Sequence, residues 1–308
     1  MNPRFLAFDW SKYDETKLYD LKLTRPLYPR YNTLTKLGYM IYCSASRDQV
    51  YDFFRYNPGA INQPSDSGIT PLMVALIKTR SYGSDIIVQL LLDYGVNFDY
   101  VNIHNQCALS LAILEFESLV TFRSINLMLE IGANPNTRCK FNNTPIIYAA
   151  RYCSGDRYFD LIRLLIKNGA DPKLENGCGY NALFSTIESC DIVEDGQRLE
   201  MVEYFLNKGV DINARSKNAS TVFLLECRNV AKKLSKTCDV LKALIENEAD
   251  VYVEDNMNNT AMKLLSEHPY PLGLIAALSE PKPKTKTSYT TKVKNIIKSK
   301  TKLISSSI

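Results

Sequence analysis

A short phrase recurs at a nearly fixed interval along the chain. It consists of a glycine, a small apolar residue and then Asn or Asp, and each copy closes an apolar run. The glycines of the four clear copies lie 37, 37 and 40 residues apart, at Gly95, Gly132, Gly169 and Gly209. Weaker copies begin at Gly59 and Glu248. A period of about 20 to 50 residues is typical of stacked repeat arrays, which present an extended binding surface.

Each copy predicts two helices. The first begins at a phrase of the type Thr-Pro-Leu, because Thr or Asn can accept from free backbone N–H groups as an N-cap and proline fits the first helical position. These N-cap positions are Thr70, Cys107, Thr144, Asn181, Thr221 and Thr260. The second helix carries a Val/Leu/Ile stripe, and the glycine ends it in the left-handed conformation.

The turn between repeats is nearly constant in length. The step from the glycine position to the next N-cap position is 12 residues in all copies but the first, where it is 11. Length variation therefore collects between the two helices, in connectors such as 190–198 and 228–237, where a longer loop costs little entropy. At Glu248, where a side chain replaces the glycine, we expect a costlier helix end.

These residues resemble the ankyrin repeat, whose pattern is visible from Thr144-Pro145 to Gly169-Ala170-Asp171. The resemblance covers about residues 35–279. It implies an all-α solenoid of about six to seven stacked helix-turn-helix units with hairpin-like turns between them. The predicted repeats are approximately 35–69, 70–106, 107–143, 144–180, 181–220, 221–259 and 260–280. The expanded connectors look like those of ankyrin proteins from large DNA viruses, with giant viruses of amoebae first and poxviruses next.

One family residue is missing from this sequence. A His commonly follows the Thr-Pro-Leu phrase in ankyrin repeats, and its hydrogen bonds support the repeat. Here its places hold Met73, Ser110, Ile147, Phe184 and Leu224. We therefore expect packing to replace that hydrogen bonding.

The two ends of the chain differ from the array. Residues 1–34 are aromatic and polar, and they are predicted to form an N-terminal cap; a short recognition segment is the alternative. Residues 281–308 form a basic tail that is predicted to be disordered. Its eight lysines, Lys282, Lys284 and Lys286 among them, exceed the chain's net charge of +4, so residues 1–280 carry −4.

Catalytic and metal-binding motifs are absent from the sequence. No phosphate loop, dinucleotide fingerprint or nucleophile elbow occurs, and neither His104 nor His268 has a Cys or Ser at a suitable spacing. The eight cysteines are scattered without a Cys-x-x-Cys pair, as expected of a reduced chain that uses Cys as a small apolar residue. Glu194 and Asp195 are interpreted as a solvated connector face. No enzyme activity, cofactor or metal is predicted.

The resemblance places partner contacts on the turns between repeats. The candidate contact residues there are Tyr100, Arg138, Lys140, Phe141, Tyr180, Arg215 and Lys217. The neighbouring Glu254 and Asp255 are also expected to be exposed. Tyr and Arg are the residue types that most often anchor protein interfaces.

Two functions from different classes follow from these features. The first is a non-enzymatic scaffold or adaptor that binds a protein, with a host protein as the expected partner. The alternative is association of the basic tail with nucleic acid or an anionic membrane, with the array as a spacer. No apolar run is long enough for a membrane span, and nucleic acid is not an expected partner of the array. We expect an intracellular, cytoplasmic monomer, with the nucleus accessible through the tail.

Overall fold

A computed structural model describes residues 19–20, 33–78, 84–116, 119–152, 155, 157–190, 193–232, 234 and 237–266. Within the predicted cap, the described part is a pair of two-residue antiparallel strands, β1 (Tyr19–Asp20) and β2 (Thr33–Leu34), which add a minor strand pair to an otherwise helical fold. The predicted basic tail, with Lys282, Lys284 and Lys286, lies outside the described residues. The chain divides into two compact units.

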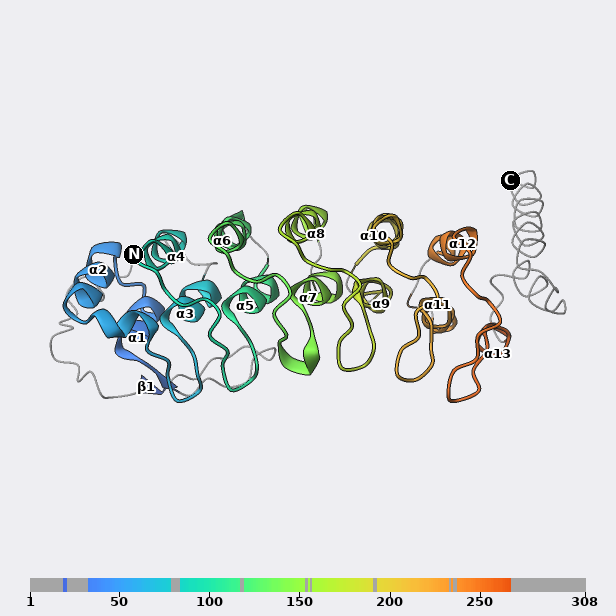
Figure 1. The fold of residues 1–308 in the computed structure, drawn as a ribbon, viewed down its shortest axis with the longest axis horizontal. Helices are drawn as coiled ribbons and strands as arrows, with labels where there is room; N and C mark the ends of the chain where they lie inside the picture. Colours follow the sequence, from blue (N-terminus) through green and yellow to red (C-terminus); the bar gives the residue numbers. More distant parts are fainter. Residues whose placement is uncertain are drawn as a thin grey trace. The chain divides into compact units, whose positions relative to one another are not determined.

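Unit 1 comprises residues 1–149 and 160–170. Its first helices, α1 (Lys36–Tyr42), α3 (Pro71–Ile77) and α5 (Ala108–Leu114), pack side by side as one layer. Its second helices form the other layer in the same order; they are α2 (Arg47–Tyr56), α4 (Ser84–Asp93) and α6 (Leu119–Glu130) (Figure 1). Two short 3₁₀ helices, η3 (Pro58–Asn62) and η4 (Lys140–Asn142), lie in the turns.

Unit 2 comprises residues 150–159 and 171–308, so α7 (Pro145–Tyr152) and α8 (Tyr158–Lys167) each contribute residues to both units. In unit 2, α9 (Ala182–Glu188), α11 (Val222–Ala231) and α13 (Ala261–Leu265) pack in one layer. The second layer holds α10 (Asp195–Asn207) and α12 (Asp239–Glu246). The predicted solenoid of helix pairs is confirmed.

The first helices begin where the repeat pattern predicts. The side chains of Thr70, Cys107, Asn181, Thr221 and Thr260 each accept from the backbone N–H three residues on. Thr144 is an exception, because its buried hydroxyl oxygen makes no hydrogen bond within the described part of the chain. The prediction of a side-chain cap is therefore wrong for α7, which begins at a proline without one.

The second helices end as the glycine phrase predicts. The four glycines of the clear copies all have a positive φ, for example +73° at Gly95 and +75° at Gly209. Glu248 adopts the same conformation, with φ +69°, although its Cβ makes that region unfavourable. The structure thus shows a side chain in the conformation for which a costlier helix end is expected.

Packing has replaced the missing family histidine. Met73, Phe184 and Leu224 are fully buried on the first helices, and Ile147 is nearly so. Ser110 is the exception, since its hydroxyl donates to the Cys107 carbonyl and accepts from the Cys107 N–H. The apolar stripes of paired helices thus form a continuous core inside each unit.

Candidate partner-binding surface

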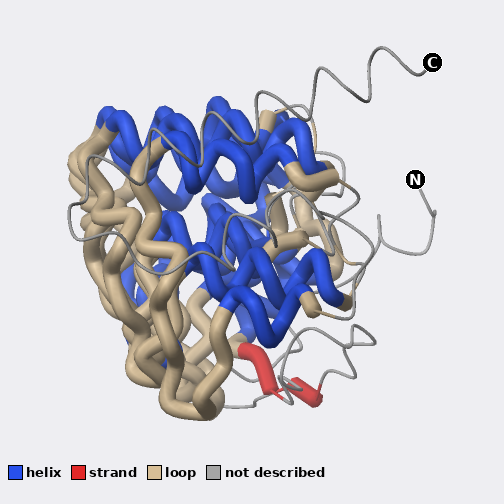
Figure 2. Tube along the Cα trace, turned by 90° about the vertical axis from the view of Figure 1, so that its right-hand side faces the viewer, coloured by secondary structure: helices blue, strands red, loops and turns tan. Residues whose placement is uncertain are grey.

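The turns between repeats are six β-hairpin loops of one design, which we call fingers. In each finger the first residue donates its N–H to the carbonyl of the fifth, and the fourth donates to the carbonyl of the first, at N–O distances of 2.8 to 3.2 Å. The fingers are residues 65–69, 102–106, 139–143, 176–180, 216–220 and 255–259. In both units they gather on one side of the helix pairs (Figure 2).

The fourth residue of every finger is left-handed, which is the geometry of a three-residue hairpin loop with a bulge. These residues are Gly68, Asn105, Asn142, Gly179, Ala219 and Asn258, with φ between +53° and +76°. Our sequence interpretation missed this second period. The glycines and asparagines carry the signal for it, because Gly and Asn are the residues that adopt positive φ at least cost.

The first residue of most fingers also holds the loop with its side chain. Oδ1 of Asn102, Asn176 and Asp255 each accepts from two backbone N–H groups of its own finger. Ser65 accepts from one, the N–H of Ile69. These Asx-type bonds keep the exposed loops ordered without a hydrophobic core.

Neighbouring fingers within a unit are joined by main-chain hydrogen bonds. In unit 1, Ile103 N–H donates to the Ser67 carbonyl at 3.3 Å and Lys140 N–H donates to the Asn105 carbonyl at 2.8 Å. In unit 2, the corresponding bonds run from Lys217 to Cys178 and from Asn256 to Asn218, both at 3.0 Å. Each unit thus presents its fingers as a connected edge with fixed spacing.

Finger 139–143 departs from the common design. Phe141 and Asn142 both have φ +59°, whereas every other finger has a single left-handed residue. Phe141 is 70% exposed, and the Lys140 ammonium lies 5.1 Å from the centroid of its ring. A bulky residue in this region of φ is strained, and such strain often marks a functional position.

The structure separates the predicted contact residues into two groups. Arg138, Lys140 and Phe141 in unit 1, and Arg215 and Lys217 in unit 2, are exposed on or beside the fingers. The other two, Tyr100 and Tyr180, are half-buried. The predictions omitted two apolar residues that are strongly exposed on fingers, Ile103 in unit 1 and Met257 in unit 2.

Tyr180 and Asp255 have structural roles that explain their burial. The Tyr180 ring stacks on Phe184 with centroids 4.8 Å apart, and burial raises the pKa of its hydroxyl. Asp255 is buried, which contradicts the expectation of an exposed carboxylate. Burial acts to raise the pKa of Asp255, but hydrogen bonds from Asn259 and Met257 and the charge of Arg228 outweigh it and lower the pKa overall.

Unit 2 also contains a buried charge cluster near the loops that connect the first and second helices of its repeats. We call this the connector side. Arg198 and Glu226 are fully buried and their side chains lie 2.7 Å apart, from Arg198 Nη2 to Glu226 Oε2. Asp195 Oδ1 accepts from Arg198 Nη1 at 3.2 Å, and its Oδ2 accepts from the N–H of Thr237. The interpretation of Asp195 as part of a solvated face is wrong, because its side chain is only 12% exposed.

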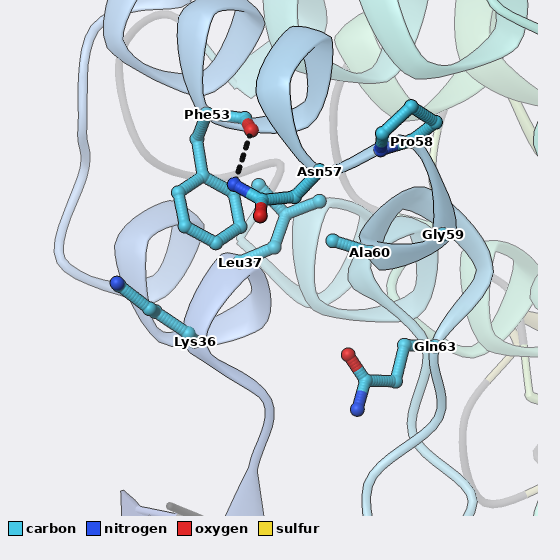
Figure 3. Close-up of a pocket in the computed structure, with 8 residues that line it drawn as sticks. All are labelled: Lys36, Leu37, Phe53, Asn57, Pro58, Gly59, Ala60 and Gln63. Carbon is cyan, nitrogen blue, oxygen red and sulfur yellow. Dashed lines mark hydrogen bonds between the residues drawn. The ribbon is translucent and has the colours of Figure 1, made fainter. Parts of the chain in front are cut away.

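A hollow of about 390 Å³ lies beside the first helix pair of unit 1. Figure 3 shows Lys36 and Gln63 on opposite sides of it, with Leu37 between them. The Lys36 ammonium lies 5.1 Å from the Phe53 ring centroid, and Asn57 Nδ2 donates to the Phe53 carbonyl at 2.9 Å. The side chains of Lys36 and Asn57 are thus engaged in local contacts beside the hollow.

No cluster of three or more His, Cys, Asp or Glu is placed to hold a metal ion in the described ranges. Nor does any helix in those ranges have the length and apolar character to cross a bilayer.

Comparisons with known proteins agree with this geometry. Residues 118–216 match the family model for three copies of the ankyrin repeat, and residues 67–106 match the model for a single ankyrin repeat. Residues 67–106 and 118–216 therefore carry ankyrin repeats. This family's repeats form a non-enzymatic fold that mediates protein–protein interaction.

A curated relative and a solved structure are similar to this chain. The chain is 28% identical over 158 residues to an ankyrin repeat protein of Acanthamoeba polyphaga mimivirus. The match covers 46% of this chain but only 27% of that relative. The ankyrin repeat domain of Bcl-3, a member of the IkappaB protein family, superposes with a TM-score of 0.57 at 20% identity, over 74% of this chain and 92% of that chain. The first supports the predicted resemblance to giant-virus ankyrin proteins, and the second supports the fold.

Proposed function

We propose that the chain is a non-enzymatic scaffold that binds a partner protein through the exposed fingers of unit 1. The observation that carries the proposal is Phe141, a 70% exposed aromatic residue held in a strained left-handed conformation next to Lys140. An aromatic side chain supplies a large apolar contact area and is a common anchor of protein interfaces.

The surroundings of Phe141 extend this anchor into a surface. Ile103 is 66% exposed on the neighbouring finger, which is joined to finger 139–143 through the bond from Lys140 N–H to the Asn105 carbonyl. Arg138 is exposed and its guanidinium donates to the Asn142 carbonyl, which holds a cation at the base of the finger. Two apolar residues flanked by two cations favour a partner with an apolar pocket and acidic groups at its rim.

The source of the partner is a separate proposal. Similarity to a protein of a virus named for its amoebal host supports a host protein as the partner. The intracellular location, the monomeric state and the basic-tail alternative stay predictions.

The test is capture from a host-cell lysate by the full chain and by two charge-matched double variants. The finger variant is Lys140→Glu with Phe141→Asp. The control variant is Arg123→Glu with Ile86→Asp, which makes the same changes of charge and apolarity at exposed positions on α6 and α4. The finger variant should lose most of the partner that the wild type and the control retain.

Two results would contradict the proposal. Equal capture by both double variants would remove the fingers as the binding surface. Loss of capture on deletion of residues 281–308, together with a steep fall in binding as salt rises, would favour the basic-tail alternative instead.

A further inference from the structure

Two cysteines occupy positions at which the other repeats have a side chain with an oxygen atom. Cys107 is the N-cap of α5, whereas the N-cap positions of the other first helices from α3 onward are Thr70, Thr144, Asn181, Thr221 and Thr260. Cys139 is the first residue of finger 139–143, whereas the other fingers begin with Ser65, Asn102, Asn176, Ser216 and Asp255. Both replacements of oxygen by sulfur fall in unit 1.

The two replacements meet in space. The Sγ atoms of Cys107 and Cys139 lie 3.6 Å apart, and both residues are buried. Sulfur is a poorer hydrogen-bond acceptor than oxygen. Ser110 N–H reaches Cys107 Sγ at 3.5 Å, and finger 139–143 lacks the Asx-type bonds that hold fingers 102–106 and 176–180.

The pair has the electrostatics of a reactive dithiol. The hydrogen bond between the two sulfur atoms lowers the pKa of Cys139. The same bond, with burial, raises the pKa of Cys107. The lowered pKa favours the thiolate of Cys139, which is the nucleophilic form, beside the Cys107 thiol.

We propose that Cys107 and Cys139 form a redox-active dithiol that hydrogen peroxide closes to an intramolecular disulfide, and that closure rearranges finger 139–143. In the first step the Cys139 thiolate attacks one peroxide oxygen, the O–O bond breaks, and a sulfenic acid forms as hydroxide leaves and takes up a proton. In the second step Cys107 sulfur attacks the Cys139 sulfur, its own proton departs, and the sulfenic oxygen leaves as water. Overall, two thiols lose two electrons and two protons, and one peroxide becomes two waters.

The finger is the part that we expect to move on closure. A disulfide bond is about 2.05 Å long, so the sulfurs must approach by roughly 1.5 Å. Cys107 is fixed at the start of a buried helix, whereas Cys139 lies between exposed residues, Arg138 on one side and Lys140, Phe141 and Asn142 on the other. The same exposure gives a small oxidant a short route to Cys139 when the finger opens locally.

The chemistry is tested on the full chain treated with hydrogen peroxide, then blocked with iodoacetamide, digested and analysed by mass spectrometry. We expect a cross-linked peptide pair that joins Cys107 to Cys139 and has lost two hydrogens. Cys107→Ser and Cys139→Ser should each abolish it, whereas Cys178→Ser, which removes the exposed thiol of finger 176–180, should leave it unchanged. A cross-link that forms between other cysteines, or oxidation of Cys139 to sulfinic acid without a cross-link, would overturn the dithiol.

The conformational part has its own readout in amide hydrogen exchange. In the oxidised wild type, the amides of residues 139–143 should exchange about tenfold faster or more, because closure disrupts the two hydrogen bonds of the finger. Peroxide-treated Cys139→Ser should show no such change. A disulfide that forms without altered exchange would overturn the rearrangement of the finger.

The consequence for partner binding rests on the proposed function, because the finger that moves carries Phe141. The two proposals fail separately. The peroxide experiment uses no partner, so a missing disulfide leaves binding through Phe141 intact. Equal capture by the double variants leaves the dithiol intact.

Discussion

The finger side and the connector side of unit 2 are built by opposite means. Each finger repeats one backbone hairpin held by main-chain bonds, and the side chains of Asn176 and Asp255 reinforce two of the three. The connector side instead depends on one buried charge pair, Arg198 with Glu226, which recurs at no equivalent position of the described helix pairs. Because the hairpins are held mainly by main-chain bonds, their exposed side chains can vary, which suits a binding surface. A single buried ion pair instead makes the stability of the unit depend on two particular residues.

The largest expected effect comes from breaking the buried pair. Glu226→Ala should lower the free energy of unfolding of unit 2 by about 3 kcal/mol, because it leaves the Arg198 charge buried without its main partner. Urea unfolding measures this loss. The double variant Arg198→Met with Glu226→Leu should recover most of it, since an apolar pair avoids the desolvation penalty. If Glu226→Ala were as stable as the wild type, the connector side would not depend on the buried pair, and the contrast with the finger side would not hold.

A smaller effect is expected where two fingers touch. Gly179→Ala should cost about 2 kcal/mol, because φ is +76° and the new Cβ would lie 3.0 Å from Lys217 N on the neighbouring finger. Gly209→Ala is the matched control, with φ +75° and only the end of the Lys173 side chain nearby, and it should cost about 1 kcal/mol. Equal losses in urea unfolding would mean that the fingers do not constrain one another.

The smallest effect is expected at the irregular helix end. Glu248→Gly should raise the free energy of unfolding by about 0.5 kcal/mol, because glycine relieves the positive φ and loses part of that gain to chain entropy. Glu248→Ala keeps the Cβ and should give no gain. If alanine stabilises the unit as much as glycine does, the carboxylate rather than the backbone is responsible.

The repeated features of the molecule were the predictable ones. The caps at Thr70 and Thr221 and the helix ends at Gly95 and Gly209 could be inferred because the same physical requirement recurs in every copy. The pair of Arg198 and Glu226 could not, since the residues are 28 positions apart, belong to different repeats and have no equivalent elsewhere.

The location of the candidate binding surface could be predicted from the sequence, but the conformations and contacts of its residues could not. The turns were identified from the fixed step between glycine and N-cap, and Arg138, Lys140 and Phe141 are exposed there. The strain at Phe141 depends on its φ, which no periodic signal encodes. The contact between Cys107 and Cys139 was also missed, because each cysteine was interpreted alone as a small apolar residue.

The most direct test of the finger surface places a photo-crosslinking phenylalanine analogue, p-benzoylphenylalanine, at position 141 and, in a second protein, at position 86 on α4. Both sites are exposed, 70% and 49%, and the analogue preserves the aromatic character of Phe141. After irradiation in host-cell lysate, the account predicts a specific protein adduct from position 141 that unlabelled wild-type protein competes away, and none from position 86. Competed adducts from position 86 alone, or equally from both positions, would contradict it.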